Sequence, residues 1–462
     1  MAAAGEVWDR AHRGLTIGLL STVAFTAFEA LAVATVLPTT VDEIGGLALY
    51  GWAFSAFMLS SLIGITAGGS LADRRGPALP FLAGAAVFVG GLIGAGASPT
   101  MPLLVAARFV QGLGSGAIGS VSYVAVGRGY SPEARPRMIA LLSSAWVIPG
   151  LVGPALAGLV TDVFGWRWVF FGLAPATAVG AAIAAPAMQR LARGADTTAE
   201  PVATGEHRTR DAFLLTLGAG LLMGGLEGSN GAAAAALALG GLLLGVPAAR
   251  RLLPPGTLLA RTDLGAAVAL IGLTGFAFFG AEAFLPLAIS GVRDQPATIA
   301  GLPLTIGTLT WTAGAWIQAR ETDRRSRRSL VVLGFLLIGA GVAGTSAILV
   351  PSIPLWAAGL AWGVTALGMG ITYSTLALVI LECAREGEEG RASAALQLSY
   401  TLCIALGTGV GGGIVALATR LGRDLSTGIA LVNVVMVVVV LVAILGTGRI
   451  PKTREEAQQV AS

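Results

Sequence analysis

The sequence YGWAFSAFMLSSLIGITAGGSLADRRGPALPFLAGAAVFVGGLIGAGAS, residues 50–98, consists of two long apolar runs on either side of one short basic turn. A helix of about 20 apolar residues crosses the hydrocarbon core of a bilayer. Each run approaches that length, and backbone groups in lipid must be satisfied within the segment, which favours helices. Residues 50–98 therefore predict a helical hairpin that crosses a membrane twice.

The same kind of apolar run recurs along the whole chain. We count fourteen runs, with approximate centres at Phe25, Ser61, Val89, Ser115, Pro149, Ala178, Ala219, Ala238, Thr274, Ile306, Gly339, Thr365, Ile404 and Met436. Their pattern differs from the alternating segments of about 10 residues that are typical of a membrane β-barrel. The expected fold class is therefore an all-α polytopic membrane protein.

The composition indicates that lipid is the main solvent of this surface. Of 462 residues, 55% are hydrophobic and 12% are charged, whereas a soluble domain carries about 25% charged residues. This balance excludes an ordinary soluble enzyme, and the high hydrophobicity excludes a disordered chain. The basic residues stand in short clusters between apolar runs, so we expect no nucleic-acid partner. Cys383 and Cys403 are too few for a disulfide framework and are expected to be free thiols.

Basic residues predict the orientation, because cytoplasmic loops are rich in Lys and Arg. With the N-terminus inside, 24 of the 29 basic residues fall in inner segments and 4 in outer loops, while Arg108 lies inside a run. The first run, residues 14–37, is too long for the apolar core of a signal peptide, so we expect it to be retained. We therefore expect a multi-pass protein of the plasma (inner) membrane with both termini cytoplasmic.

A polar stretch near the middle divides the runs into two halves. We expect an N-terminal six-helix bundle over 1–188, a cytoplasmic linker over 189–211, an extra pair of helices over 212–249 and a C-terminal six-helix bundle over 250–462. Charge alone does not separate fourteen spans from twelve, because removing the extra pair leaves both termini on the same side. A re-entrant or interfacial hairpin is the alternative for that pair.

Weak internal repeats relate the two halves. The matching positions, 250 to 257 residues apart and in chain order, are Asp73 and Asp323, Glu29 and Glu282, Gly114 and Gly368, Gly116 and Gly370, and Gly150 and Gly407. Duplicated halves around a site at the bilayer midplane are the usual plan of secondary transporters.

The turn of the first hairpin carries candidate gating residues. Gly69 and Gly76 are expected to permit a tight cytoplasmic turn. Asp73 is expected to accept hydrogen bonds from the backbone at a nearby helix start. Arg74 could bridge to the other half or to anionic lipid headgroups, and a solvated turn is the alternative.

An acid and a base lie at similar depth inside the first half. Arg108 is roughly 9 Å and Glu29 roughly 12 Å from the outer ends of their runs, at about 1.5 Å per residue. A cation inside the bilayer needs a partner, so we expect Glu29 and Arg108 to pair, with Gln111 on the same helix face as Arg108. A pair that weakens when Glu29 takes up a proton would couple transport to protons. A static pair that holds two helices together is the alternative.

Residues 149–158, PGLVGPALAG, combine prolines that bend a helix with glycines that let another helix approach closely. The residues expected to act in gating are Pro149, Gly150, Gly153, Pro154 and Gly158. They would form a hinge or a dry seal between the halves, and a kinked packing helix is the alternative.

Glu282 lies among aromatic residues in the second half. It is a second candidate for proton coupling or a contact for a cationic ligand, and an acid that reaches water at the helix end is the alternative. The candidate substrate-binding residues are Phe25, Gln111, Tyr123, Phe278, Phe279, Tyr373, Gln397 and Tyr400. Packing is the alternative for the residues in the later helices. Both histidines, His12 and His207, lie outside the apolar runs, so we expect no metal site and no cofactor.

These strings resemble the major facilitator superfamily over nearly the whole chain. GGSLADRRGP at 68–77 is similar to that family's loop between helices two and three, and RFVQGLGSG at 108–116 to its fourth-helix motif. PGLVGPALAG at 149–158 resembles the fifth-helix motif of its proton-coupled exporters, and GWRWVFFGLAP at 165–175 the start of helix six. With the extra pair of helices, the chain resembles the fourteen-helix drug:proton antiporter branch. The resemblance implies alternating access driven by the proton gradient, although Glu29 stands where that branch usually has Asp.

Proton-coupled export of lipophilic small molecules, cationic ones among them, is the function we expect. The alternatives are a proton-coupled metabolite uptake permease, an exporter of lipids or lipid conjugates, and a non-transporting receptor or scaffold. No nucleophile–base pair, metal cluster or phosphate loop stands in the sequence, so we expect no enzyme. The expected partners are a small-molecule substrate, protons and membrane lipids, and the expected state is a monomer.

Overall fold

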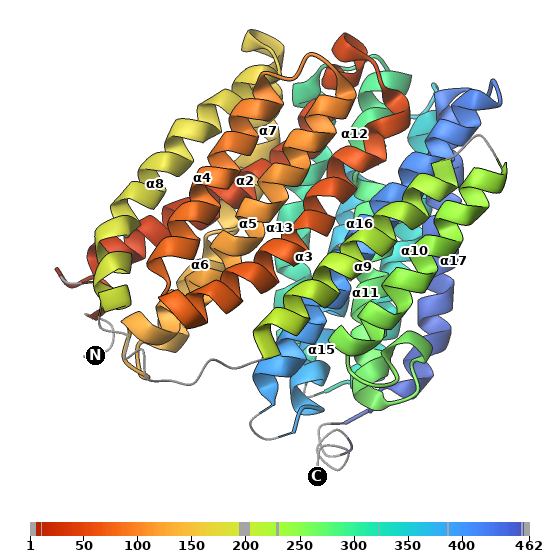
Figure 1. Cartoon of the computed structure of the whole chain (residues 1–462). Coiled ribbons are helices and arrows are strands. Elements are labelled where there is room, and N and C mark those ends of the chain that lie inside the picture. The colour runs from red at the N-terminus through yellow and green to blue at the C-terminus, as the bar shows by residue number, and fades with distance from the viewer. Residues whose placement is uncertain are drawn as a thin grey trace. The chain divides into compact units, whose positions relative to one another are not determined.

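The structure, a computed structural model, describes residues 6–10, 12–193, 204–227, 231–322, 324–385, 388–453 and 456. Over these ranges the chain is built from helices and contains no strand (Figure 1). The expected all-α class is therefore confirmed. Asp323 of the predicted repeat and residues 194–203 of the predicted linker lie outside the described residues.

The described helices fall before and after the predicted linker. Before it lie α2 (Arg13–Ile44), η1 (Leu47–Leu49), α3 (Tyr50–Arg75), α4 (Ala78–Gly96), α5 (Met101–Gly129), α6 (Arg135–Ser144), α7 (Val147–Phe164) and α8 (Arg167–Arg193). After it begin α9 (Thr204–Glu227), α10 (Gly231–Leu252), η2 (Thr257–Leu259), α11 (Asp263–Glu282), α12 (Leu285–Leu287) and η3 (Ala288–Val292). The chain continues with α13 (Ala297–Glu321), α14 (Arg327–Thr345), η4 (Ser346–Leu349), α15 (Trp356–Glu382), α16 (Glu389–Arg420), α17 (Leu425–Gly446) and η5 (Thr447–Arg449).

Twelve helical segments among the described residues are long and apolar enough to cross a membrane. α10 is one of them, whereas α9 and α13 are not. α9 begins with the polar sequence TGEHRTRD, which shortens its apolar part. The multi-span membrane class is confirmed, and the expected count of fourteen spans is not.

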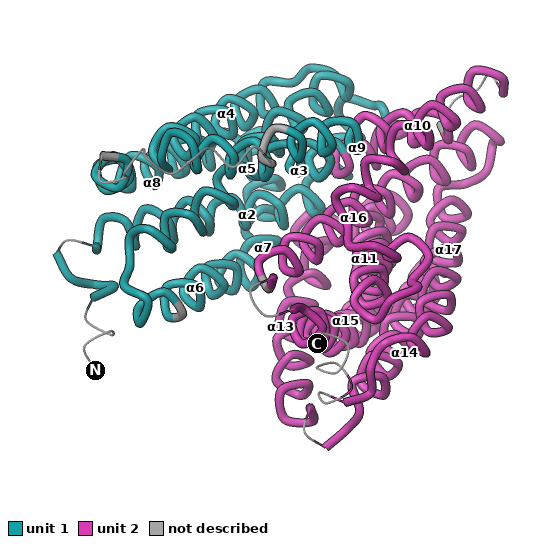
Figure 2. Tube along the Cα trace, turned by 60° about the horizontal axis from the view of Figure 1, so that its bottom comes forward, with its two compact units in different colours: residues 1–46, 56–216 teal, residues 47–55, 217–462 magenta. Residues whose placement is uncertain are grey.

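The chain forms two compact units (Figure 2). Unit 1 comprises residues 1–46 and 56–216, and unit 2 comprises residues 47–55 and 217–462. α3 therefore begins in unit 2, and the remainder of this helix belongs to unit 1. Within unit 1, α5 packs on α4, and α2 packs on α7 and α8; within unit 2, α15 packs on α13 and α14, and α11 packs on α16.

The repeated glycines occupy equivalent places in the two units. A Cβ atom on Gly114 would overlap the backbone of α4, and one on Gly116 would overlap the backbone of α3. In unit 2, Gly368 is in the same close contact with α14, and Gly370 with α13. The helix triplet α3–α4–α5 thus corresponds to α13–α14–α15, and the predicted repeat has a structural cause.

We expect Gly116→Ala to lower the free energy of unfolding by about 1–3 kcal/mol, the usual cost of overpacking a tight contact. Gly119→Ala is the matched control, because an added Cβ there meets no atom within 4 Å. At that position alanine should be neutral or stabilise the helix by up to about 1 kcal/mol. Thermal unfolding of both purified variants in detergent measures the difference. Equal melting temperatures would contradict the close-packing argument.

The turn between α3 and α4 is shorter than expected. α3 continues to Arg75, so Gly69, Asp73 and Arg74 lie in its last turns and not in a loop. Gly76 has a φ of 77°, a left-handed conformation that favours glycine. An added Cβ at Gly69 meets no atom within 4 Å, so no packing constraint accounts for that glycine.

The predicted bend near Pro149 occurs earlier in the chain. α6 ends at Ser144 and α7 begins at Val147, so Pro149 lies in the first turn of α7. A proline in the first turn interrupts no helical hydrogen bond, because the N–H groups there have no partner within the helix. Pro154 is the proline inside α7. The helix break thus lies before Pro149.

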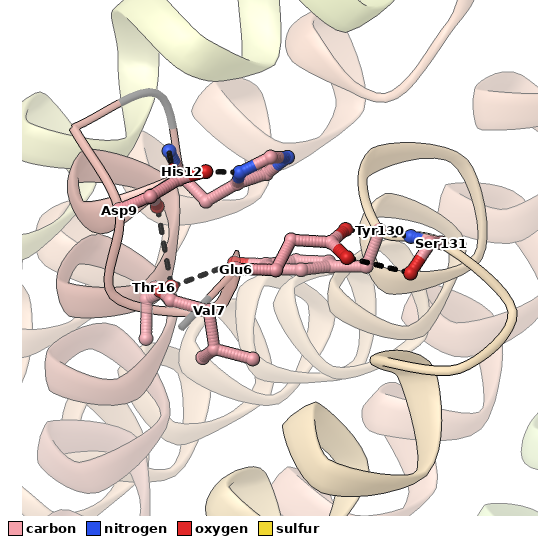
Figure 3. A network of polar contacts seen from close by, with 7 residues as sticks. All are labelled: Glu6, Val7, Asp9, His12, Thr16, Tyr130 and Ser131. Atoms are coloured by element: carbon pink, nitrogen blue, oxygen red, sulfur yellow. Dashed lines mark hydrogen bonds and ion pairs between the residues drawn. The ribbon is translucent and has the colours of Figure 1, made fainter. Parts of the chain in front are cut away.

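The segment before α2 is anchored to the connection between α5 and α6 (Figure 3). Glu6 accepts hydrogen bonds from the backbone N–H of Ser131 at 2.9 Å and from its hydroxyl at 2.6 Å. These bonds hold the pKa of Glu6 below its ordinary value, so the contact persists at neutral pH and is lost as the pH falls through that lowered pKa. The Thr16 hydroxyl donates to the Val7 carbonyl at 2.6 Å and lies 2.8 Å from the Tyr130 hydroxyl.

Candidate functional site

Unit 1 contains a buried cluster built around Arg108 of α5. Nη1 of Arg108 forms an ion pair with Oε1 of Glu29 on α2 and donates to Oε1 of Gln111 at 2.5 Å. The guanidinium carbon lies 4.3 Å from the ring centroid of Phe57 on α3. Glu29 is 0% and Arg108 is 2% exposed. The predicted pairing of Glu29 with Arg108 is present, and its role in proton coupling stays a prediction.

Close helix packing brings these groups together. An added Cβ on Gly112 would overlap the backbone of Phe57, so the glycine allows α5 to lie against α3 at this level. An added Cβ on Gly91 of α4 would likewise overlap the backbone of Gln111, so this glycine lets α4 lie against α5. Two charged groups out of water must satisfy each other, because an unpaired buried charge is costly.

The hydrogen bonding of this cluster is incomplete. Oε2 of Glu29 and Nε2 of Gln111 are buried and have no hydrogen-bond partner among the described residues. A carboxylate with one oxygen in an ion pair and the other oxygen free can accept a proton at the free oxygen. Oε2 of Glu29 is therefore the atom of this cluster at which a proton can be added without breaking a described hydrogen bond.

Unit 2 contains an aromatic cluster. Phe278 of α11 lies 4.8 Å from Trp362 and 5.4 Å from Trp311, measured between ring centroids. Phe279 lies 5.9 Å from Tyr400 of α16. The remaining contacts of the cluster join Phe278 with Phe279, Phe279 with Trp311, Trp311 with Tyr373, and Tyr373 with Tyr400. Four of the candidate substrate-binding residues are thus brought together.

Glu282 lies beside this cluster. It follows Phe278 by four residues and Phe279 by three, so all three side chains share one face of α11. Glu282 lies near enough to Tyr400 to interact with it electrostatically. Its side chain is half-buried, and the described residues include no ion-pair or hydrogen-bond partner for its carboxylate. The result is an acid without a counter-ion at the edge of a ring cluster.

Sequence reasoning missed the two tryptophans of this cluster as site residues. Trp362 stands 254 positions after Arg108, the same separation as Gly114 and Gly368, so the repeat could have indicated it. Trp311 carried no comparable signal, because its place depends on how α13 packs against α11 and α15.

The other candidate substrate-binding residues are scattered. Gln111 belongs to the Arg108 cluster. Tyr123 on α5 and Gln397 on α16 are exposed, and Phe25 on α2 is half-buried, one turn before Glu29. The described contacts do not connect these last three residues with either cluster.

The gating candidates have identifiable neighbours within unit 1. Asp73 forms an ion pair with Arg128 at the end of α5, at 3.7 Å, and not with the start of a helix as we expected. On α7, Pro149, Gly150, Gly153, Pro154 and Gly158 are all buried. A Cβ on Gly153 would lie 3.6 Å from the ring of Phe28, so this face of α7 lies against α2.

Comparison with known proteins identifies the family model that matches this chain. A model described as Major Facilitator Superfamily matches residues 14–408. A probable multidrug-efflux transporter of Mycobacterium tuberculosis is 26% identical over 426 residues, covering 87% of this chain and 88% of the relative. An uncharacterized MFS-type transporter of the same organism is 28% identical over 417 residues. That alignment covers 85% of this chain but 58% of the relative, so the chain spans little more than half of that protein's length.

Two solved structures have a similar fold. An auto-inhibited POT family peptide transporter matches with a TM-score of 0.69 and 15% identity, covering 94% of this chain and 97% of the other. A D-xylose-proton symporter matches with a TM-score of 0.63 and 14% identity, covering 95% and 98% of the two chains. At this identity the likeness establishes the fold alone.

Proposed function

We propose that this chain, which belongs to the Major Facilitator Superfamily, exports lipophilic cationic molecules in exchange for protons. As a member of that family it is a multi-span membrane transporter and not an enzyme. The proposal concerns the coupling ion, the direction and the chemical class of the substrate.

Proton coupling is supported by the buried pair of Glu29 and Arg108, which is the observation that carries the proposal. When Glu29 is ionised, it neutralises Arg108 in a buried site. When Oε2 of Glu29 takes up a proton, the charge of Arg108 loses its counter-ion, and the packing of α2 on α5 becomes less favourable. A change in protonation thus biases the arrangement of these two helices, which is the requirement for coupling.

Cation binding is supported by the aromatic cluster with Glu282. Four of the six rings, those of Phe279, Trp311, Tyr373 and Tyr400, are partly exposed, whereas Phe278 and Trp362 are buried behind them. A cation over such a ring face gains about 0.5–2 kcal/mol per contact. The carboxylate of Glu282 supplies a negative charge for a bound cation. No Lys or Arg among the described residues forms an ion pair with it. Export is supported by the relative described as a probable multidrug-efflux transporter.

The finer features of the sequence prediction belong to this proposal. We propose fourteen spans, with six-helix bundles over 1–188 and 250–462 and the extra pair over 212–249 after the linker at 189–211. α10 meets the criteria for a span, and α9 packs on it through Gly218 and Gly241 in close backbone contact. We further propose a monomer in the inner membrane with both termini cytoplasmic, and gating roles for the residues of 69–76 and 149–158.

The proposed function is tested by a substrate screen in inverted membrane vesicles, with and without an imposed pH gradient. Lipophilic cations should accumulate only when the gradient is present and the chain is expressed. Accumulation of a neutral metabolite with the opposite dependence on the gradient would indicate an uptake permease, and movement of labelled lipids alone would indicate a lipid exporter. Either result would contradict the proposal.

We expect Glu282→Gln to weaken the binding of tetraphenylphosphonium about tenfold, equivalent to about 1.4 kcal/mol. The reason is the loss of the carboxylate beside the aromatic cluster, while the shape of the side chain is kept. Glu321→Gln at the end of α13 is the matched control, because Glu321 forms ion pairs with arginines there. Equilibrium binding to the purified protein measures both. Unchanged affinity in Glu282→Gln would remove Glu282 from the substrate site.

A further inference from the structure

Helix α11 is interrupted directly after Glu282. Ala283 and Phe284 form a turn, a short helical segment begins at Leu285, and it widens into the π-helical residues 288–292. The last carbonyl groups of a helix have no partner within it. Glu282 is the last residue of α11, so its side chain lies next to this break.

Tyr50, the first residue of α3, donates a hydrogen bond to this break. Its hydroxyl lies 2.8 Å from the carbonyl oxygen of Ala283. The Tyr50 side chain is 0% exposed, and its ring lies 5.4 Å from that of Phe284 and 5.7 Å from that of Phe54. A buried hydroxyl is almost always paired, and Ala283 is the partner that the described residues provide.

The neighbours of Tyr50 hold it in place. An added Cβ on Gly51 would overlap the backbone of α16 at Thr408, so the start of α3 lies directly on that helix. The Ser55 hydroxyl donates to the Ala405 carbonyl at 2.7 Å and lies 2.9 Å from the Thr408 hydroxyl. Residues 47–55 therefore belong to unit 2 through specific contacts, although they precede it by more than 150 positions in the chain.

We propose that Tyr50 is a positioning residue for Glu282. Its hydroxyl fixes the break of α11 through the Ala283 carbonyl, and the fixed break directs Glu282 to the edge of the aromatic cluster. The inference rests on the proposed function in so far as Glu282 binds a cation there. The inference adds Tyr50 to the residues that shape the cation site, although Tyr50 is far from the aromatic cluster in sequence.

The test compares Tyr50→Phe with the wild-type chain, purified at full length. The substitution removes the hydroxyl and keeps the ring that packs on Phe284. Amide hydrogen exchange of residues 283–292 should become about three- to tenfold faster, the range that one buried hydrogen bond supplies. The affinity for tetraphenylphosphonium should fall by a similar factor, and binding of an uncharged lipophilic dye should not change.

Tyr130→Phe is the matched control, because it removes another buried tyrosine hydroxyl, one that is bonded to Thr16 in unit 1. It should change neither the exchange of residues 283–292 nor cation binding. Exchange in Tyr50→Phe equal to that of the wild type would overturn the inference. So would faster exchange with unchanged affinity, because Tyr50 would then be structural only.

A carbodiimide gives a reading that is independent of the substrate. Such reagents react with the protonated form of a carboxyl group in apolar surroundings, and in the empty site this form is in equilibrium with the carboxylate that binds a cation. Glu282 should react several-fold more slowly in Tyr50→Phe, where the loosened break lets the carboxyl group reach water. If the wild type binds no cation, the proposed function fails. Slower labelling together with faster exchange would then still support Tyr50 as the residue that positions Glu282, and unchanged labelling would overturn it.

Discussion

Glu29→Gln is expected to abolish gradient-driven export while counterflow exchange of the same substrate continues. The amide keeps the size of the side chain and can still accept a hydrogen bond from Arg108, but it cannot bind or release a proton. Steps that need only substrate binding therefore remain possible, and the step that uses the proton gradient does not. The measurement is transport in liposomes that contain the purified variant, once with a pH gradient and once with substrate on both sides.

Glu43→Gln is the matched control for this experiment. Glu43 lies on the same helix, α2, and is also bonded to an arginine, Arg167, as well as to the indole N–H of Trp166 at 2.8 Å. Its side chain is 51% exposed, whereas that of Glu29 is buried. Gradient-driven export should therefore survive in Glu43→Gln. Full export in Glu29→Gln would remove Glu29 from the coupling mechanism and leave its pair with Arg108 as a static link.

The sequence predicted the Glu29–Arg108 contact because a membrane imposes few solutions on a buried charge. Each residue has a depth set by its distance from the end of an apolar run, and two opposite charges at the same depth stabilise each other. The repeat was predictable for a similar reason: Gly114 and Gly368 are required wherever two helices touch through their backbones. A sequence therefore indicates paired charges through their common depth, and close helix contacts through their glycines.

Features that depend on local helix geometry were not predictable in this way. Apolar runs mark where helices lie but not where they break, so the bend was expected at Pro149 and lies before Val147. Gly69 was expected in a turn, but the helix continues past it because nothing in residues 69–75 stops it. The hydrogen bond from Tyr50 to Ala283 joins residues 233 positions apart, and no periodicity connects them.

The two units carry different chemistry on related frameworks. The position of Arg108 corresponds to Trp362, so the charged cluster of unit 1 is replaced by aromatic rings in unit 2. Glu29 and Glu282 also correspond, yet the first is paired with an arginine and the second has no described counter-ion. Under the proposed function, the cluster of unit 1 would handle protons and the cluster of unit 2 would bind the cation, and the different chemistry of the two clusters is consistent with that division.

The free energy of unfolding should show a large non-additive effect at the Glu29–Arg108 pair. Glu29→Leu removes the carboxylate that is paired with the buried guanidinium of Arg108, and a guanidinium cannot lose its proton. We expect this variant to be destabilised by about 3–5 kcal/mol. Arg108→Leu should cost less, because the carboxyl group of Glu29 can become neutral by taking up a proton. The double variant should recover most of the loss, since two leucines replace both charges.

Thermal and denaturant-induced unfolding of the purified chains in detergent measures this cycle. The control cycle replaces Glu43 and Arg167 with leucine, singly and together, because an exposed ion pair contributes at most about 1 kcal/mol. The contrary outcome is an additive one, in which the double variant of Glu29 and Arg108 loses as much free energy of unfolding as the two single variants together. It would show that the two charges do not stabilise each other. The Glu29 carboxylate would then not neutralise Arg108, and the coupling model would lose its physical basis.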